Sequence, residues 1–141
     1  MNLIILKIKR DDLIEALNTA VDLYGGGWFL DTETGDILLK SDGVDDLPED
    51  LEDNPRFYSI EPISSRESFH IMEAFVKNLG SSQIAEHLET VLKRPKLFRC
   101  FKDTLYDYPN LPEAWFVFEQ KKLERLAEQW CEQNGIAMEW I

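Results

Sequence analysis

Short stretches of apolar and β-branched residues mark the first sixty positions as strand-forming. Residues 3–9 predict one strand. Residues 28–31 and 36–40 predict a hairpin, because the segment between them contains Gly35, which supplies the positive φ angle of a tight turn. Residues 57–61 predict a further short extended piece. The N-terminal part is therefore expected to form a small sheet.

One helix interrupts these strands. Asp12 and Glu15 have the spacing of a capping box, and apolar positions recur on one face as far as Leu23. The glycines at 25–27 are expected to end this helix. They lack the spacing of a phosphate-binding loop, and they follow a helix where such loops follow a strand.

From residue 62 onward the apolar positions recur with the period of helices. Ser64 and Glu67 predict the start of a helix that ends at Gly80, and Ser81 or Ser82 begins the next one. A short helix follows Pro95 and is expected to bury Leu97, Phe98, Phe101 and Leu105. A last helix, with Asn110 and Glu113 as its cap pair, is expected to end at Gly135 and to bury Trp115, Phe116, Leu123, Leu126, Ala127 and Trp130.

This order predicts an α+β fold, with a small mostly antiparallel sheet, one N-terminal helix, and about four packed C-terminal helices. The sheet is expected to contain residues 3–9, 28–31, 36–40 and 57–61. The length predicts a single domain over residues 1–141, with residues 1–61 rich in strands and residues 62–141 helical. Residues 136–141 are apolar enough to add a strand.

The charge narrows the classes of function. Fifteen Lys and Arg against 27 Asp and Glu give a net charge of −12, which disfavours sequence-independent binding to nucleic acid or to an anionic membrane. The apolar runs are too short for a membrane span or a signal peptide, so we expect a soluble cytoplasmic protein.

Cysteine and histidine are too few for a structural metal site. Cys100 and Cys131 lie in apolar helical patterns and are expected to be reduced core residues. With His70 and His87 they do not reach the four ligands of structural zinc. We expect no metal and no cofactor.

Two charged segments stand out. Residues 41–55, here called the acidic segment, contain seven acids and no base. We expect a mobile, solubilising surface loop; the alternatives are a mimic of nucleic-acid charge and an arm that occupies a basic partner. Residues 93–102, here called the basic segment, contain five bases and no acid. Lys96, Arg99 and Lys102 fall opposite its apolar face and are the best candidates for contact with a partner, although a solvated face paired with the protein's own acids explains the same pattern.

An enzymatic interpretation rests on other residues. Arg66, Glu67 and His70 lie near the start of one predicted helix and, with Arg99, are the candidate lining of a pocket in a small hydrolase or nucleotide-acting enzyme. Glu67 and His70 also have the spacing found in helical di-iron sites, but the second motif that such sites need is missing. No residue is assigned a catalytic role.

Several short motifs resemble a known family. They are Tyr24 with Trp28-Phe29-Leu30-Asp31, Thr34-Gly35, Ser65-Arg66-Glu67, Phe98-Arg99-x-Phe101-Lys102-Asp103, Tyr108-Pro109 and Ala114-Trp115-Phe116-x-Phe118-Glu119. Over roughly residues 12–136 the chain resembles the bacterial Uncharacterised Protein Family zero-one-five-eight. Cys100 departs from the family pattern, which has a base there. The resemblance implies a small bacterial cytoplasmic protein and implies no activity.

The leading functional hypothesis is a non-enzymatic protein-interaction or regulatory module whose partner is another protein. The alternatives are the small enzyme described above and an RNA-binding protein that uses residues 93–102. Inward-facing phenylalanines in that segment argue against base stacking. The sequence does not specify the partner or the oligomeric state.

Overall fold

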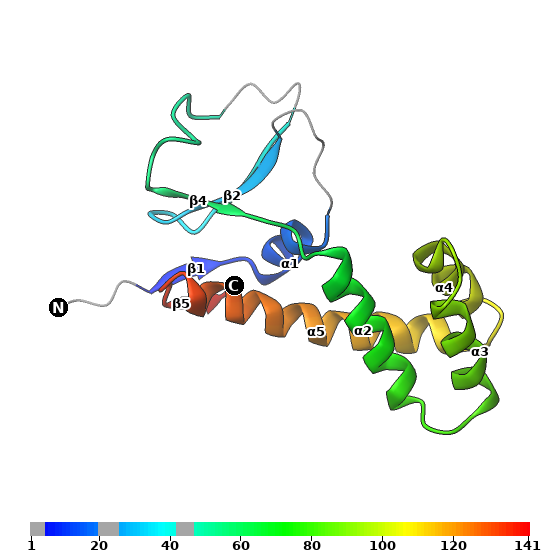
Figure 1. Cartoon of the computed structure of the whole chain (residues 1–141). Coiled ribbons are helices and arrows are strands. Elements are labelled where there is room, and N and C mark those ends of the chain that lie inside the picture. Colours follow the sequence, from blue (N-terminus) through cyan, green and yellow to red (C-terminus); the bar gives the residue numbers. More distant parts are fainter. Residues whose placement is uncertain (1–4, 20–25, 42–46) are drawn as a thin grey trace. The chain divides into compact units, whose positions relative to one another are not determined.

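The computed structural model describes residues 5–19, 26–41 and 47–141 and confirms the α+β class. Contacts divide the chain into two compact units. The first contains the described residues up to Ile63 together with Leu123–Ile141, and the second is Ser64–Lys122. The elements, shown in Figure 1, are β1 (Leu6–Ile8), α1 (Arg10–Asn18), β2 (Gly27–Asp31), β3 (Ile37–Lys40), β4 (Phe57–Ile60), α2 (Ser65–Asn78), α3 (Gln83–Leu92), α4 (Leu97–Leu105), α5 (Leu111–Gln133) and β5 (Met138–Trp140).

The first unit contains two small sheets. In the antiparallel sheet β2 lies between β3 and β4, with Trp28 opposite both Leu39 and Ile60. The strand at the N-terminus does not join this sheet, so that part of the prediction is wrong. Instead β1 pairs in parallel with β5, with Leu6 opposite Met138. The strand expected within residues 136–141 is thereby confirmed. It is the pairing partner of β1, which the local sequence pattern around β1 does not specify.

Helix α1 begins three residues earlier than predicted. Lys9 precedes it and makes no side-chain capping hydrogen bond, so the capping box of Asp12 and Glu15 is wrong. Asp11 and Asp12 instead lie in the first turn, where a negative charge interacts favourably with the helix dipole. The helix ends at Asn18 because Thr19 is extended, so the prediction of one helix as far as Leu23 is wrong. Residues 20–25 lie outside the described residues, and Gly27 begins β2.

The core of the first unit forms between the two sheets' strands, α1 and the last part of α5. Ile8, Leu13 and Leu30 are inaccessible to solvent and belong to the same cluster as Leu123 and Cys131. Burial raises the pKa of the Cys131 thiol to about 11, and the nearby charge of Glu132 adds to this effect. Both cysteines are free thiols, and Cys131 is a core residue as expected, whereas Cys100 is only half-buried.

The described part of the acidic segment packs against the antiparallel sheet. Leu51 is only 3% exposed and clusters with Phe29 of β2 and Phe57 of β4. Glu52 pairs with Lys40 at the end of β3. Residues 47–55 are therefore held by Leu51, by the partly buried Leu47 and by one ion pair, which differs from the freely mobile loop expected from composition.

The second unit is helical, and α2 and α3 begin at the predicted caps, whereas Asn110 before α5 has a φ of 67° and makes no capping hydrogen bond with Glu113 among the described residues. The Glu67 backbone N–H donates to Ser64 Oγ at 3.1 Å, and the Ala85 N–H donates to Ser82 Oγ at the same distance, which confirms both predicted N-caps. Gly80 has a φ of +72° just after α2. These caps satisfy backbone groups that a helix end otherwise leaves unpaired.

Aromatic rings form the centre of the second unit. Phe75 of α2, Phe101 of α4 and Trp115 of α5 contact one another edge to face, with ring centroids 5.0 to 6.4 Å apart. Two rings expected in the core are not there, because Phe98 is 36% exposed and Phe116 is 60% exposed. Phe98 lies in the first turn of α4, and Phe116 is turned about 100° from the buried Trp115 around the helix. None of the helices in the described ranges is long and apolar enough to cross a membrane.

Candidate functional site

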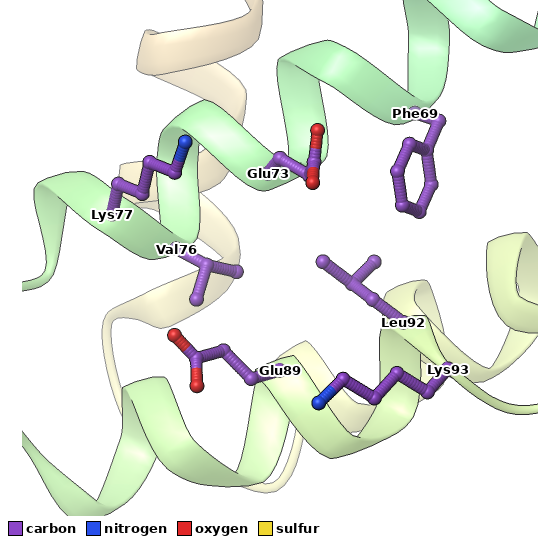
Figure 2. Close-up of a pocket in the computed structure, with 7 residues that line it drawn as sticks. All are labelled: Phe69, Glu73, Val76, Lys77, Glu89, Leu92 and Lys93. Atoms are coloured by element: carbon purple, nitrogen blue, oxygen red, sulfur yellow. The ribbon is translucent and has the colours of Figure 1, made fainter.

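A pocket of about 300 Å³ lies between α2 and α3, inside the second unit. Figure 2 shows side chains from both helices directed toward the same space. The lining residues, which define what we call the α2–α3 pocket, are Phe69, Glu73, Val76, Lys77, Glu89, Leu92 and Lys93.

The pocket combines an apolar lining with charges of both signs. Val76 and Leu92 are buried core residues that show one side to the pocket, and Phe69 is half-buried beside them. Each helix adds a glutamate followed four residues later by a lysine. These are Glu73 and Lys77 on α2, and Glu89 and Lys93 at the end of α3. Across the described residues, these four charges form no ion pair with one another. Lys77, Glu89 and Lys93 have no ion-pair partner among the described residues, whereas the Glu73 carboxylate contacts His70.

The sequence-predicted residues of α2 do not line this pocket. Arg66, Glu67 and His70 are all exposed. The Nδ1 atom of His70 is 3.1 Å from Oε1 of Glu73, so His70 contacts one of the pocket's carboxylates. In the part of the chain that the structure describes, no hydrogen bond or ion pair joins these three residues to Arg99. Their convergence with Arg99 stays a prediction.

The basic segment connects α3 to α4 and continues along α4. Lys93 and Arg94 follow α3, Lys96 precedes α4 with a φ of 56°, and Arg99 and Lys102 lie on α4 itself. All five side chains belong to exposed residues. Lys93 also lines the α2–α3 pocket, so the pocket and the basic segment share a residue.

The protein's own acids neutralise these bases only weakly within the second unit, whose residues are all described. The one ion pair is between Arg99 Nε and Asp103 Oδ2 at 3.9 Å, with both side chains exposed, and such pairs contribute about 0–1 kcal/mol. Burial raises the pKa of the half-buried Glu119, and the charge of Lys102 opposes this shift, which places Lys102 within electrostatic reach of that carboxylate. Lys96 and Arg94 have no ion-pair partner among the described residues.

Charge is divided unequally between the two units. Residues 64–122 carry nine bases and eight acids, which gives a net charge of +1. The rest of the chain carries six bases and nineteen acids, which gives −13. The acidity that disfavours anionic partners therefore belongs to the first unit. The second unit is nearly neutral and contains the basic segment.

Comparison with known proteins agrees with the motifs noted in the sequence. The Uncharacterised protein family (UPF0158) matches residues 1–140. The chain belongs to this family. A UPF0158 protein of Pseudomonas aeruginosa is 32% identical over 126 residues, which cover 87% of this chain and 82% of that relative. No solved structure matches the chain. The family match includes the N-terminal strand, which the sequence motifs had left outside the resemblance.

The pocket of this UPF0158 chain was not expected from its sequence, although one signal pointed to it. The Glu-x-x-x-Lys spacing occurs at 73–77 and again at 89–93, on consecutive predicted helices. Such pairs usually stabilise a solvent-exposed helix face, so the spacing alone does not indicate a pocket. In the described residues, no group of three or more His, Cys, Asp or Glu side chains is placed to hold a metal ion.

Proposed function

We propose that this UPF0158 protein is a non-enzymatic interaction module that binds an acidic segment of a partner protein, in the cytoplasm as its sequence predicts. One observation carries the proposal: residues 93–102 present five exposed bases with no acid among them. The weak Arg99–Asp103 pair leaves most of this charge available.

Electrostatics of the two units supports the same partner chemistry. At physiological ionic strength the Debye length is about 8 Å, so charges beyond that distance are largely screened. A partner at the basic segment therefore responds chiefly to nearby charge, and the unit that carries the segment has a net charge of +1. Complementary charge would speed the encounter and fix the orientation of an acidic segment.

Charge reversal tests the proposal. We expect Lys96→Glu with Arg99→Glu to weaken binding of a fluorescently labelled glutamate-rich peptide at least about tenfold, measured by fluorescence anisotropy. The matched control is Lys121→Glu with Lys122→Glu, which changes the net charge equally on α5 outside the basic segment. We expect this control to bind within about twofold of the unaltered protein. Equal weakening by both pairs would show that only net charge matters and would contradict the proposal.

Single-stranded RNA is a second candidate because Phe98 is partly exposed. In the sequence Phe98 immediately precedes Arg99 and is two residues from Lys96, and an exposed ring in a basic segment is able to stack on a nucleotide base. A short oligouridylate probe distinguishes the two candidates. RNA binding predicts a steep loss of affinity with salt and a further loss on Phe98→Ala. Binding of the acidic peptide without binding of the oligouridylate favours the protein partner.

A further inference from the structure

We infer that the α2–α3 pocket receives one large apolar side chain of the same partner segment whose acidic residues meet the basic segment. This inference rests on the proposed function and makes it more specific. The partner segment would carry an apolar anchor residue next to a run of acidic residues. A segment that contains acidic residues alone would then bind less tightly.

The pocket has the volume and the lining for such an anchor. Its volume of about 300 Å³ is about twice the roughly 150 Å³ of an apolar cavity that holds a benzene molecule. Phe69, Val76 and Leu92 supply apolar contact surface from two facing helices. Grooves between two helices commonly receive the apolar side chains of a partner peptide.

The charges around the pocket determine which part of the partner enters it. Glu73 and Glu89 contribute carboxylates from opposite sides and balance the charges of Lys77 and Lys93, so the lining has no net charge that would draw an acidic side chain onto its apolar surface. In Figure 2, the Lys93 side chain runs along the α3 side of the pocket toward Glu89, and Phe69 lies on the α2 side. An acidic residue is therefore best accommodated outside the pocket, on the α3 side where Lys93 follows the helix.

Continuity along the chain joins the pocket to the basic segment. Lys93 lines the pocket, Arg94 follows it immediately, and Lys96 is two residues further on. A partner segment with its anchor in the pocket could leave past Lys93 and place its acids on these bases. The two features would then act as one binding surface within the second unit.

Two synthetic peptides test this arrangement on the full-length protein. One carries a phenylalanine followed by a run of glutamates, and the other has alanine in place of the phenylalanine. Burial of the ring predicts that the phenylalanine peptide binds about tenfold tighter. In spectra of the ¹⁵N-labelled protein, only the phenylalanine peptide should shift the amide signals of Phe69, Val76 and Leu92.

Variants assign the difference to the pocket. Leu92→Phe fills the pocket from one wall and should reduce the preference for the phenylalanine peptide to less than about twofold. Phe69→Ala, at a half-buried position, removes part of the opposite wall. It replaces Leu92→Phe in this test if the Leu92→Phe protein does not fold. The matched control is Phe116→Ala, because Phe116 is an exposed apolar residue that does not line the pocket, and it should keep the full preference.

The outcomes separate the inference from the proposed function. If both peptides bind equally well, and Lys96→Glu with Arg99→Glu weakens both, the pocket inference is overturned and the proposed function stands. If neither peptide binds the unaltered protein, both are overturned. A preference that survives Leu92→Phe and Phe69→Ala would place the anchor elsewhere and would also overturn the inference.

Discussion

Asp31 illustrates how one buried charge is held in the first unit. Its two carboxylate oxygens accept hydrogen bonds from Nε and Nη2 of Arg56, each at 2.8 Å, and Oδ1 also accepts the backbone N–H of Glu33 at 2.9 Å. The hydrogen bond with Arg56 lowers the pKa of Asp31 to about 2, against the opposing effect of burial. The pair joins the end of β2 to the residue before β4 and so fixes that edge of the antiparallel sheet.

This depressed pKa predicts a pH-dependent contribution to stability. A carboxyl whose pKa falls from 3.8 to about 2 on folding contributes roughly 2 kcal/mol, fully present above about pH 4 and lost as the pH falls through about 2. We therefore expect Asp31→Asn to lower the free energy of unfolding by about that amount at pH 6, with the difference vanishing near pH 2. Urea denaturation across this pH range measures it.

Glu33 provides the control for Asp31. Its carboxylate also pairs with Arg56, at 3.1 Å, but the side chain is 67% exposed. Glu33→Gln should therefore change the free energy of unfolding by less than about 1 kcal/mol. Similar losses of stability for both variants would contradict this explanation, and so would a loss for Asp31→Asn that persists at low pH. Either result would show that the hydrogen bonds of the ionised Asp31 carboxylate do not cause the loss.

At the scale of elements, the turn between β2 and β3 depends on Gly35. Its φ is +84°, a conformation that L side chains rarely adopt, and a Cβ atom there would overlap the backbone carbonyl oxygen of Lys7. The turn therefore lies against the N-terminal strand β1. This close approach couples two sheets that share no hydrogen-bonded strand.

Gly35→Ala tests this close approach. The positive φ and the overlap together predict a loss of about 3 kcal/mol in the free energy of unfolding. Gly135→Ala is the matched control in the same unit, since Gly135 has a φ of +68° but no atom within 4 Å of an added Cβ. It should cost only about 1 kcal/mol. Equal losses in thermal or urea unfolding would mean that the contact with Lys7 is unimportant.

Element boundaries that depend on local chemistry could be predicted from the sequence. Ser64, Ser82 and Gly80 act on backbone groups within a few residues, so their signals do not depend on distant structure. The pairing of β1 with β5 could not be predicted in this way, because it joins segments about 130 residues apart in the chain. Phe98 and Phe116 show the same limit, since helical periodicity does not specify which apolar side chains find a neighbour.

At the scale of the whole molecule, one part of the candidate site could be predicted from the sequence and the other could not. The basic segment is a property of composition and could be recognised directly in residues 93–102. The α2–α3 pocket depends on which faces of two helices meet and how closely, so Phe69 and Leu92 read as ordinary core positions in the sequence. Only the contact between the helices shows that they leave a space between them.

The separation of charge between the two units leads to a further prediction about the acidic segment. If its acids influence the basic segment only through a long-range field, their effect must depend strongly on salt. The Debye length is about 30 Å at 0.01 M ionic strength and about 8 Å at 0.15 M. Replacing Asp42, Asp45 and Asp46 with asparagine should therefore strengthen binding of the glutamate-rich peptide about two- to fivefold at low salt, and by less than about 1.5-fold at 0.15 M.

Fluorescence anisotropy at the two salt concentrations measures this difference. A glutamine-rich peptide of the same length is the control. Because this probe is neutral, its binding should respond neither to the substitutions nor to the salt concentration. A several-fold gain that persists at 0.15 M would contradict a purely long-range effect of these acids on the basic segment.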